Sequence, residues 1–134
     1  MTAPERAMAL IRAGIAAADP GAAVRRGMAA VLENPPGPGG RWQVIALGKA
    51  ARAMAEAALQ ALPDAQALVV TNAGNDTPLA GARVMRAGHP QPDDDGALAA
   101  AEVIARLTAT GPQDRVLALI SGGGSAMLPA PAEG

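Results

Sequence analysis

The sequence contains no cysteine and almost no aromatic residues. Without cysteine the chain has no disulfides, zinc–thiolate sites or cysteine nucleophiles, and this composition fits a cytosolic compartment. One tryptophan, no phenylalanine or tyrosine, and a net charge of −1 leave it without stacking aromatics or a basic block. Because nucleic-acid binding requires a positively charged stripe and often uses aromatic stacking, we expect no nucleic-acid partner.

Long apolar runs are also missing. No run reaches the roughly 18 residues that a membrane-spanning helix requires. Glu5 and Arg6 lie where a signal peptide would begin its apolar core. We therefore expect a cytoplasmic protein with no membrane partner. The length of 134 residues and the apolar content of 50% suit one domain with a real core.

Three polar residue types are so rare that their positions attract attention. Lys49 is the one lysine beside ten arginines, and His89 is the one histidine. Ser121 and Ser125 are the only serines. Polar residues that only solvate the surface would be expected at many positions along the chain, so these four positions are candidates for function.

The apolar periods and turn residues predict an α/β fold with a Rossmann-like, mainly parallel sheet flanked by helices. Two helices precede the first strand and form an N-terminal helical leader, residues 1–33. Strands and helices then alternate in a core of residues 41–134, with right-handed crossovers expected. The predicted strands are 42–47, 67–71, 83–86 and 115–120, and the predicted helices are 3–18, 20–33, 50–62 and 94–108.

The pattern also predicts which residues face the core. The last strand, up to Ile120, is apolar and is expected to be buried. The first helix carries an apolar stripe of Met8, Leu10, Ile11 and Ile15. The buried side of the 94–108 helix is expected to hold Leu98, Ala101, Ile104, Ala105 and Leu107.

The last predicted strand runs directly into Ser121-Gly122-Gly123-Gly124-Ser125. Glycines allow the backbone to adopt positive φ and to approach a ligand closely, and Ser125 is a good helix N-cap. A strand, a glycine loop and a helix start are typical of an anion site, although a tight turn alone is the simpler interpretation. The loop matches neither the P-loop nor the dinucleotide fingerprint, and neither serine has the Gly-x-Ser-x-Gly setting of a nucleophile.

Lys49 follows Gly48 at the end of the first predicted strand. The carboxyl ends of parallel strands meet at one edge of a sheet, where ligands bind. A cation near a helix start is disfavoured by the helix dipole, which favours a functional role over a solvated lysine. His89, between Gly88 and Pro90, is either a general base or donor or a structural hydrogen-bonding residue.

Acidic residues follow His89 along the chain. Asp93, Asp94 and Asp95 are interpreted as helix N-cap and first-turn charges in preference to Mg²⁺ ligands. A lone histidine without cysteine is a poor metal site. The sequence therefore assigns no metal ligand.

Three motifs occur in order, at residues 46–55 (ALGKAARAMA), 87–93 (AGHPQPD) and 119–128 (LISGGGSAML). In order and spacing they resemble the N-terminal domain of the bacterial and archaeal glycerate 2-kinases that carry a C-terminal MOFRL domain. Some members of that family have been labelled hydroxypyruvate reductase. The resemblance covers nearly all 134 residues, including the two leading helices.

The resemblance implies ATP-dependent phosphorylation of D-glycerate to 2-phosphoglycerate, with ATP and Mg²⁺ as cofactors and an active site between two domains. Carried over, Gly48 and Lys49 would bind the substrate carboxylate or the transferring phosphate. Ser121, Gly122, Gly123, Gly124 and Ser125 would bind phosphate or carboxylate. Lys49 and His89 are the candidate catalytic residues, with the role of His89 left open.

The MOFRL domain has no counterpart in the sequence, so we expect residues 1–134 to be an incomplete N-terminal glycerate kinase domain, part of a longer protein that forms homo-oligomers. Activity of this part alone is an open question. Two alternatives stand beside the kinase: a nicotinamide-dependent hydroxypyruvate reductase and a non-catalytic binding fragment. A hydride-transfer enzyme would be expected to carry the dinucleotide fingerprint, which the sequence lacks.

Overall fold

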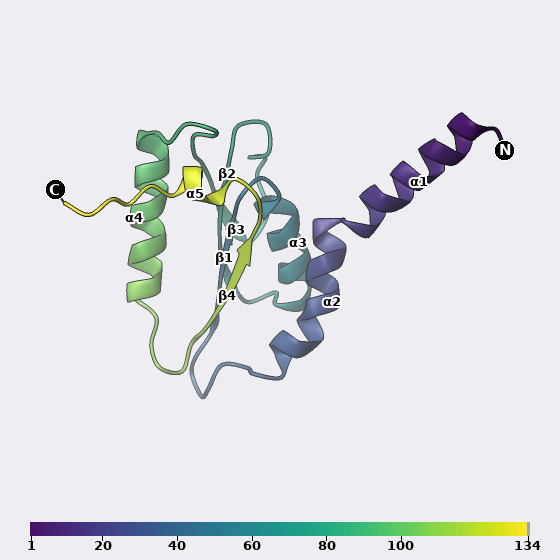
Figure 1. The fold of residues 1–134 in the computed structure, drawn as a ribbon. Coiled ribbons are helices and arrows are strands. Elements are labelled where there is room, and N and C mark those ends of the chain that lie inside the picture. The colour runs from purple at the N-terminus through teal and green to yellow at the C-terminus, as the bar shows by residue number, and fades with distance from the viewer. Residues whose placement is uncertain (134) are drawn as a thin grey trace.

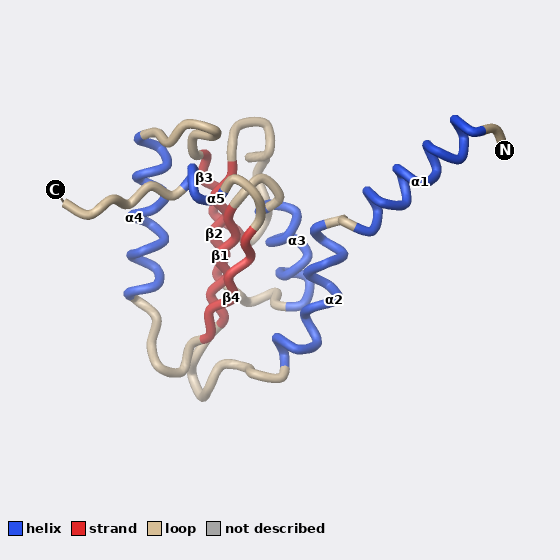
Figure 2. Tube along the Cα trace, viewed as in Figure 1, coloured by secondary structure: helices blue, strands red, loops and turns tan. Residues whose placement is uncertain are grey.

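Four parallel strands form one sheet in the middle of the computed structural model, which describes residues 1–133 (Figure 2). Gly134, the last residue of the predicted core, lies outside the described residues. All four predicted strands are confirmed within one residue at each end. They are β1 (Trp42–Leu47), β2 (Gln66–Thr71), β3 (Ala82–Arg86) and β4 (Arg115–Ile120).

Helices cover both faces of the sheet, so the α/β class predicted from the sequence is confirmed (Figure 1). α3 packs against β1 and β2 on one face, with α2 outside it, and α4 and α5 lie on the other face. The helices are α1 (Ala3–Ala17), α2 (Pro20–Leu32), α3 (Ala51–Ala61), α4 (Asp94–Thr108) and α5 (Gly124–Met127).

Side-chain caps fix where three of these helices begin. Thr2 and Glu5 form a reciprocal capping box at α1, and Asp19 accepts the N–H of Ala22 at α2. At α4, Asp93 is the N-cap and accepts the N–H of Gly96 at 2.8 Å. Such caps satisfy N–H groups that have no partner within the helix, and the sequence predicted all three starts.

The strand order β3-β2-β1-β4 reverses direction at β1. The chain moves outward from β1 through β2 to β3, then returns through α4 to place β4 on the other side of β1. In parallel sheets ligands bind at the carboxyl ends of the two strands where the order reverses, among the loops that follow them. Here those loops are the ones after β1 and β4, which contain Lys49 and the glycine motif.

The predicted buried face of α4 is wrong. Leu98, Ile104 and Leu107 are 64%, 54% and 42% exposed, and Ala101 and Ala105 are exposed too. The face that packs on the sheet is made of small residues: Gly96, Ala99, Ala100 and Val103. Small side chains let the helix backbone lie close to the sheet, and apolar periodicity alone does not distinguish that face from the larger apolar one.

The predicted burial of the last strand is also wrong. Among residues 1–133, β4 is an edge strand with only β1 as its neighbour, and Val116 and Ile120 are 44% and 69% exposed. An edge strand with exposed apolar residues is open to further pairing. The buried core lies instead around β1 and β2, where Val44, Leu68, Val69 and Val70 are fully covered.

The two leading helices differ in how they are held. α2 packs on α3 through Val24 and Met28, whereas α1 buries none of its residues and extends away from the body (Figure 1). The apolar stripe of α1 is therefore exposed. In residues 1–133 no single helix could cross a membrane; only α1 and α2 together, bent by 40°, meet the length and composition criteria.

Candidate functional site

The loops after β1 and β4 are joined to each other at the carboxyl edge of the sheet. The N–H of Lys49 donates to the carbonyl oxygen of Gly122 at 3.0 Å, and the N–H of Ala50 donates to Ser121 Oγ at 3.1 Å. The Thr71 hydroxyl at the end of β2 donates to the Lys49 carbonyl at 3.4 Å. Two of the predicted motifs, 71 residues apart at Ala50 and Ser121, thus form one structure.

Gly48 makes this close approach possible. Its φ is +109°, in the left-handed region that favours glycine, and a Cβ there would collide with the Ser121 hydroxyl and carbonyl. The first loop therefore requires glycine for two independent reasons, conformation and space.

Ser121 holds the two loops together through its side chain. Its hydroxyl donates to the Leu47 carbonyl at 3.2 Å while it accepts the N–H of Ala50. Its backbone N–H also donates to the Leu47 carbonyl, at 2.9 Å. The hydroxyl is therefore already engaged within the protein, which makes the backbone of the following glycines the more available ligand donor.

At Gly123 the glycine loop contacts the remaining motif, residues 87–93, which contains His89. Gly123 has φ +92°, and a Cβ there would lie 2.9 Å from Cδ2 and 3.1 Å from Nε2 of His89. The imidazole ring therefore lies directly against the loop. The N–H groups of Gly122 and Gly123 donate to no other atom of residues 1–133, so they are free to bind a ligand.

Ser125 does not have the predicted capping role. α5 begins with Gly123 at its N-cap position, without a side-chain cap, and Ser125 lies exposed inside this four-residue helix. The left-handed conformation of Gly123 starts the helix two residues earlier than the sequence suggested. Pro129 follows shortly after α5 ends.

A cavity of about 330 Å³ lies beside His89 at the same edge. Its lining includes Asn72 and Ala73 from the loop after β2, Arg86 at the end of β3, and Asp93. Neither Asn72 nor Arg86 was predicted as a site residue, although both lie at the carboxyl ends of predicted strands, where ligands bind in such sheets.

Asp93 fixes the loop that carries His89. Its Oδ1 accepts the N–H of Gly96 at 2.8 Å and of Gly88 at 2.9 Å, which joins the start of α4 to the residue before the histidine. The hydrogen bond from Gly96, followed by that from Gly88, lowers the pKa of this carboxyl below its usual value. These bonds engage Asp93 as a structural cap.

The lowered pKa predicts a dependence of stability on pH. A carboxyl whose folded-state pKa is depressed stabilises the protein above its unfolded-state pKa of about 4, and this contribution is lost as the pH falls through the folded-state value. Asp93→Asn is therefore expected to flatten the loss of stability below about pH 4. Urea unfolding across pH measures this, with Asp94→Asn as the control. Equal acid sensitivity in Asp93→Asn and the unmodified chain would contradict the expectation.

Lys49 is exposed at the junction of the two loops. Its backbone is held by Gly122 and Thr71, so the side chain starts from a fixed point at the carboxyl edge. Together with the free N–H groups of Gly122 and Gly123, a lysine ammonium group at this edge can bind an anion such as phosphate or carboxylate. In the described part of the chain no group of three or more His, Asp or Glu side chains could hold a metal ion.

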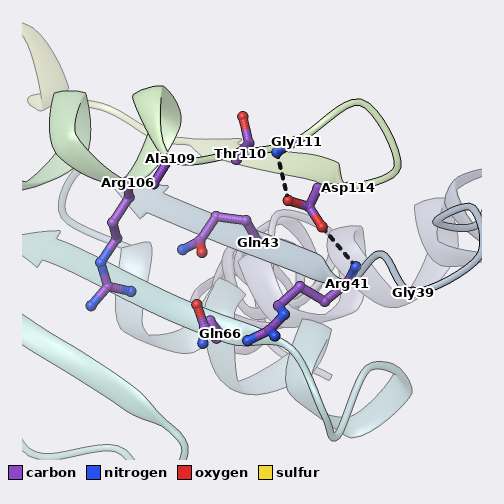
Figure 3. A pocket seen from close by; sticks show the side chains of 9 residues that line it. All are labelled: Gly39, Arg41, Gln43, Gln66, Arg106, Ala109, Thr110, Gly111 and Asp114. Carbon is purple, nitrogen blue, oxygen red and sulfur yellow. Dashed lines mark hydrogen bonds between the residues drawn. The ribbon is translucent and has the colours of Figure 1, made fainter.

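A larger cavity, of about 410 Å³, lies at the opposite edge of the sheet, among the amino ends of the strands (Figure 3). Asp114 accepts the N–H groups of Gly111 and Arg41 there. Gln43 is 6% exposed, and its Nε2 has no hydrogen-bond partner among residues 1–133. This cavity contains none of the predicted site residues.

The unpartnered amide of Gln43 predicts a stabilising substitution. A buried polar group without a partner is destabilising, and methionine has a similar shape without that group. We expect Gln43→Met to raise the free energy of unfolding by about 1 kcal/mol. Its neighbour across the strands, Gln66, is exposed, so Gln66→Met is the matched control and should change little. Equal effects of both substitutions in chemical denaturation would contradict the expectation.

The fold and its carboxyl-edge loops define a class: a parallel α/β domain that presents free backbone N–H groups, one lysine and one histidine around a glycine loop. The chain belongs to the family described as "Domain of unknown function (DUF4147)", whose model matches residues 6–134. This is the N-terminal domain of the glycerate kinase family, so the resemblance inferred from the motifs is confirmed.

Similar curated proteins carry two kinds of name. A putative hydroxypyruvate reductase of Agrobacterium vitis is 41% identical over 121 residues, covering 89% of this chain and 26% of the relative. The glycerate 2-kinase of Pyrococcus horikoshii is 43% identical over 95 residues, covering 71% of this chain and 22% of the relative. The chain thus spans about a quarter of the length of the curated relatives it matches.

Solved structures show the same fold. A glycerate kinase of Thermotoga maritima superposes with a TM-score of 0.82 at 31% identity, covering 95% of this chain and 30% of the other. A second crystal structure, of a Pyrococcus horikoshii protein, gives 0.78 at 35% identity over all of this chain and 32% of the other.

Proposed function

We propose that the chain forms the phosphate- and substrate-binding wall of an ATP-dependent D-glycerate 2-kinase. The observation that carries this proposal is the junction of three loops, where Gly122 is hydrogen-bonded to Lys49, Gly123 lies against His89, and both glycines have free N–H groups. Relatives named glycerate 2-kinase support the choice of substrate.

Phosphoryl transfer depends mainly on positioning and on neutralising charge. The 2-hydroxyl of glycerate attacks the terminal phosphorus of ATP, the bond to ADP breaks, and the hydroxyl proton must leave. Lys49 and the glycine N–H groups stabilise the negative charge of the transferring group or of the substrate carboxylate. His89, whose ring lies against Gly123, would accept the proton or orient the hydroxyl.

ATP and Mg²⁺ are part of the proposal. Backbone N–H groups in a glycine loop suit phosphate oxygens, and Mg²⁺ would supply further neutralisation of the phosphates. We also propose a cytoplasmic protein that forms homo-oligomers. The absence of cysteine supports the compartment, and the exposed apolar residues of α4 and β4 support further packing partners.

A nicotinamide-dependent hydroxypyruvate reductase is the second candidate, because two Agrobacterium vitis relatives carry that name. The first parallel strand here leads into Gly48-Lys49-Ala50. That turn lacks the spaced glycines that bring a backbone against a dinucleotide pyrophosphate.

Paired assays on the complete gene product that carries this chain separate the two candidates. The kinase proposal predicts ADP and 2-phosphoglycerate from ATP and D-glycerate, and no NADH or NADPH consumption with hydroxypyruvate. Hydroxypyruvate-dependent oxidation of NADH or NADPH without phosphorylation of glycerate would overturn it. Binding of ATP or glycerate without either turnover would favour a non-catalytic binding module.

A further inference from the structure

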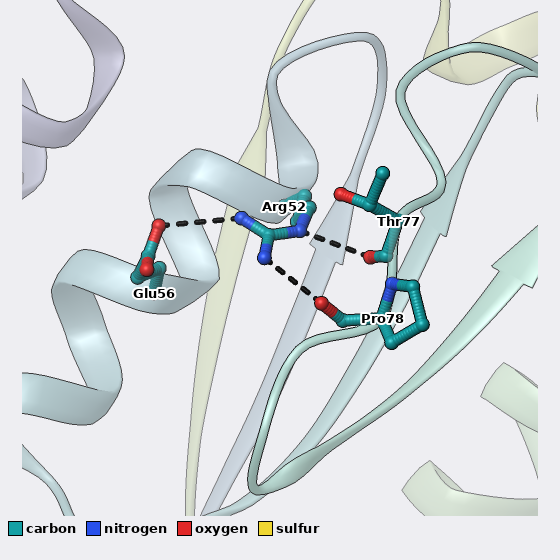
Figure 4. Close-up of polar contacts among 4 residues, drawn as sticks. All are labelled: Arg52, Glu56, Thr77 and Pro78. Carbon is teal, nitrogen blue, oxygen red and sulfur yellow. Dashed lines mark hydrogen bonds and ion pairs between the residues drawn. The ribbon is translucent and has the colours of Figure 1, made fainter.

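Arg52 occupies an unusual position for a cation. It is the second residue of α3, at the positive end of the helix dipole. Its guanidinium nevertheless makes three hydrogen bonds (Figure 4). Nε donates to the Thr77 carbonyl at 2.9 Å, Nη2 to the Pro78 carbonyl at 2.9 Å, and Nη1 to Glu56 at 3.3 Å.

The two carbonyl groups belong to the loop between β2 and β3, residues 72–81. The first half of this loop is held by its own contacts: Asn75 Nδ2 donates to Asn72 Oδ1 at 2.9 Å, and the Gly74 N–H donates to Asp76 at 3.1 Å. In the second half, Arg52 holds the Thr77 and Pro78 carbonyl groups, and Leu79 packs against the core. Gly74 and Gly81 both have positive φ, a conformation that glycine adopts without strain.

The same loop forms part of the candidate site. Asn72 and Ala73 line the cavity of about 330 Å³ beside His89, and Asp76 lies 3.9 Å from Arg86, which also lines it. Arg52 lies three residues after Lys49, at the start of the helix that follows that lysine. The guanidinium thus joins the Lys49 segment to the loop whose first two residues line the His89 cavity.

We propose that Arg52 is a positioning residue that holds loop 72–78 as a wall of the His89 cavity and thereby sets the affinity for the anionic substrate. The substrate part of this inference rests on the proposed kinase function. The planar fork of arginine reaches two carbonyl oxygens at once, which a lysine ammonium cannot do in the same geometry.

Backbone order in the loop tests the holding role without any ligand. In the 134-residue chain, ¹⁵N order parameters of Thr77 and Leu79, the amides beside the two bound carbonyl groups, should be near the rigid value of about 0.85 and fall below about 0.6 in Arg52→Met. Arg52→Lys should lie between them. Glu56→Gln keeps both carbonyl bonds and is the matched control, so it should resemble the unmodified chain. Guanidinium ion at millimolar concentration should restore order to Arg52→Met.

Kinetics of the complete gene product test the effect on the substrate. Arg52→Met should raise KM for D-glycerate about tenfold with kcat nearly unchanged, a loss of about 1.4 kcal/mol of binding. Unchanged loop order in Arg52→Met, or a general loss of order that includes β1 and β2, would overturn the proposal. A fall in kcat with unchanged KM would overturn it as well. Absence of kinase activity in the unmodified protein would contradict the proposed function instead, and the loop measurement would still decide the holding role.

Discussion

Lys49→Met is expected to lower glycerate phosphorylation by about 10²- to 10³-fold in the complete gene product, the range for losing one preorganised charge-stabilising group. Lys49 is exposed, and the hydrogen bonds at this residue use only its backbone N–H and carbonyl. Methionine keeps the length of the side chain and removes only the ammonium group. The free energy of unfolding should therefore change by less than about 0.5 kcal/mol.

Kinetics and denaturation together separate chemistry from folding in this substitution. Arg25→Met is the control, because Arg25 is an exposed cation on α2, distant from the glycine loop in sequence and paired with Asp19. It should retain full activity. Near-normal turnover by Lys49→Met would show that the lysine does not carry the charge-stabilising role assigned to it.

Gly123→Ala is expected to disturb both the glycine loop and His89. A side chain at φ +92° is strained by about 1–2 kcal/mol, and the new methyl group would lie 2.9 Å from the imidazole Cδ2. The ring must move, so its NMR signals should shift. The free energy of unfolding should fall by about 1–3 kcal/mol.

Gly122→Ala provides a control one residue away. Gly122 does not have positive φ, and a Cβ there would meet no atom within 4 Å. This substitution should leave the imidazole signals in place and change stability by less than about 0.5 kcal/mol. Equal effects of the two substitutions, measured by histidine NMR and by urea unfolding, would contradict the close contact between Gly123 and His89.

Features with local causes were predicted from the sequence. The strand boundaries follow from apolar runs ended by turn residues, and the start of α4 follows from the capping preference of Asp93. The proximity of Lys49 to the glycine motif was also predictable, because the carboxyl ends of parallel strands lie at one edge of the sheet.

Features that depend on tertiary packing were not predicted. The large apolar residues of α4 face outward because its alanine face packs on the sheet. Hydrophobicity alone predicts the reverse, with the face of large apolar residues buried. The burial of β4 depends on its position in the sheet, and the apolar pattern of a strand does not indicate whether that position is central or at the edge. Arg52 was not predicted as a site residue because it binds carbonyl groups of a loop 25 residues later. Every residue has a backbone carbonyl group, so the sequence does not indicate which of them an arginine binds.

We propose that the junction of the β1 and β4 loops binds an anionic substrate or phosphate. Titration of the ¹⁵N-labelled chain with D-glycerate, 2-phosphoglycerate and ATP tests it most directly. We predict saturable shifts of the amide signals of Lys49, Gly122 and Gly123, with those of Gly111 and Asp114 at the opposite edge unchanged. Shifts confined to the opposite edge, or no saturable shift at the three junction amides with any of these ligands, would contradict the claim.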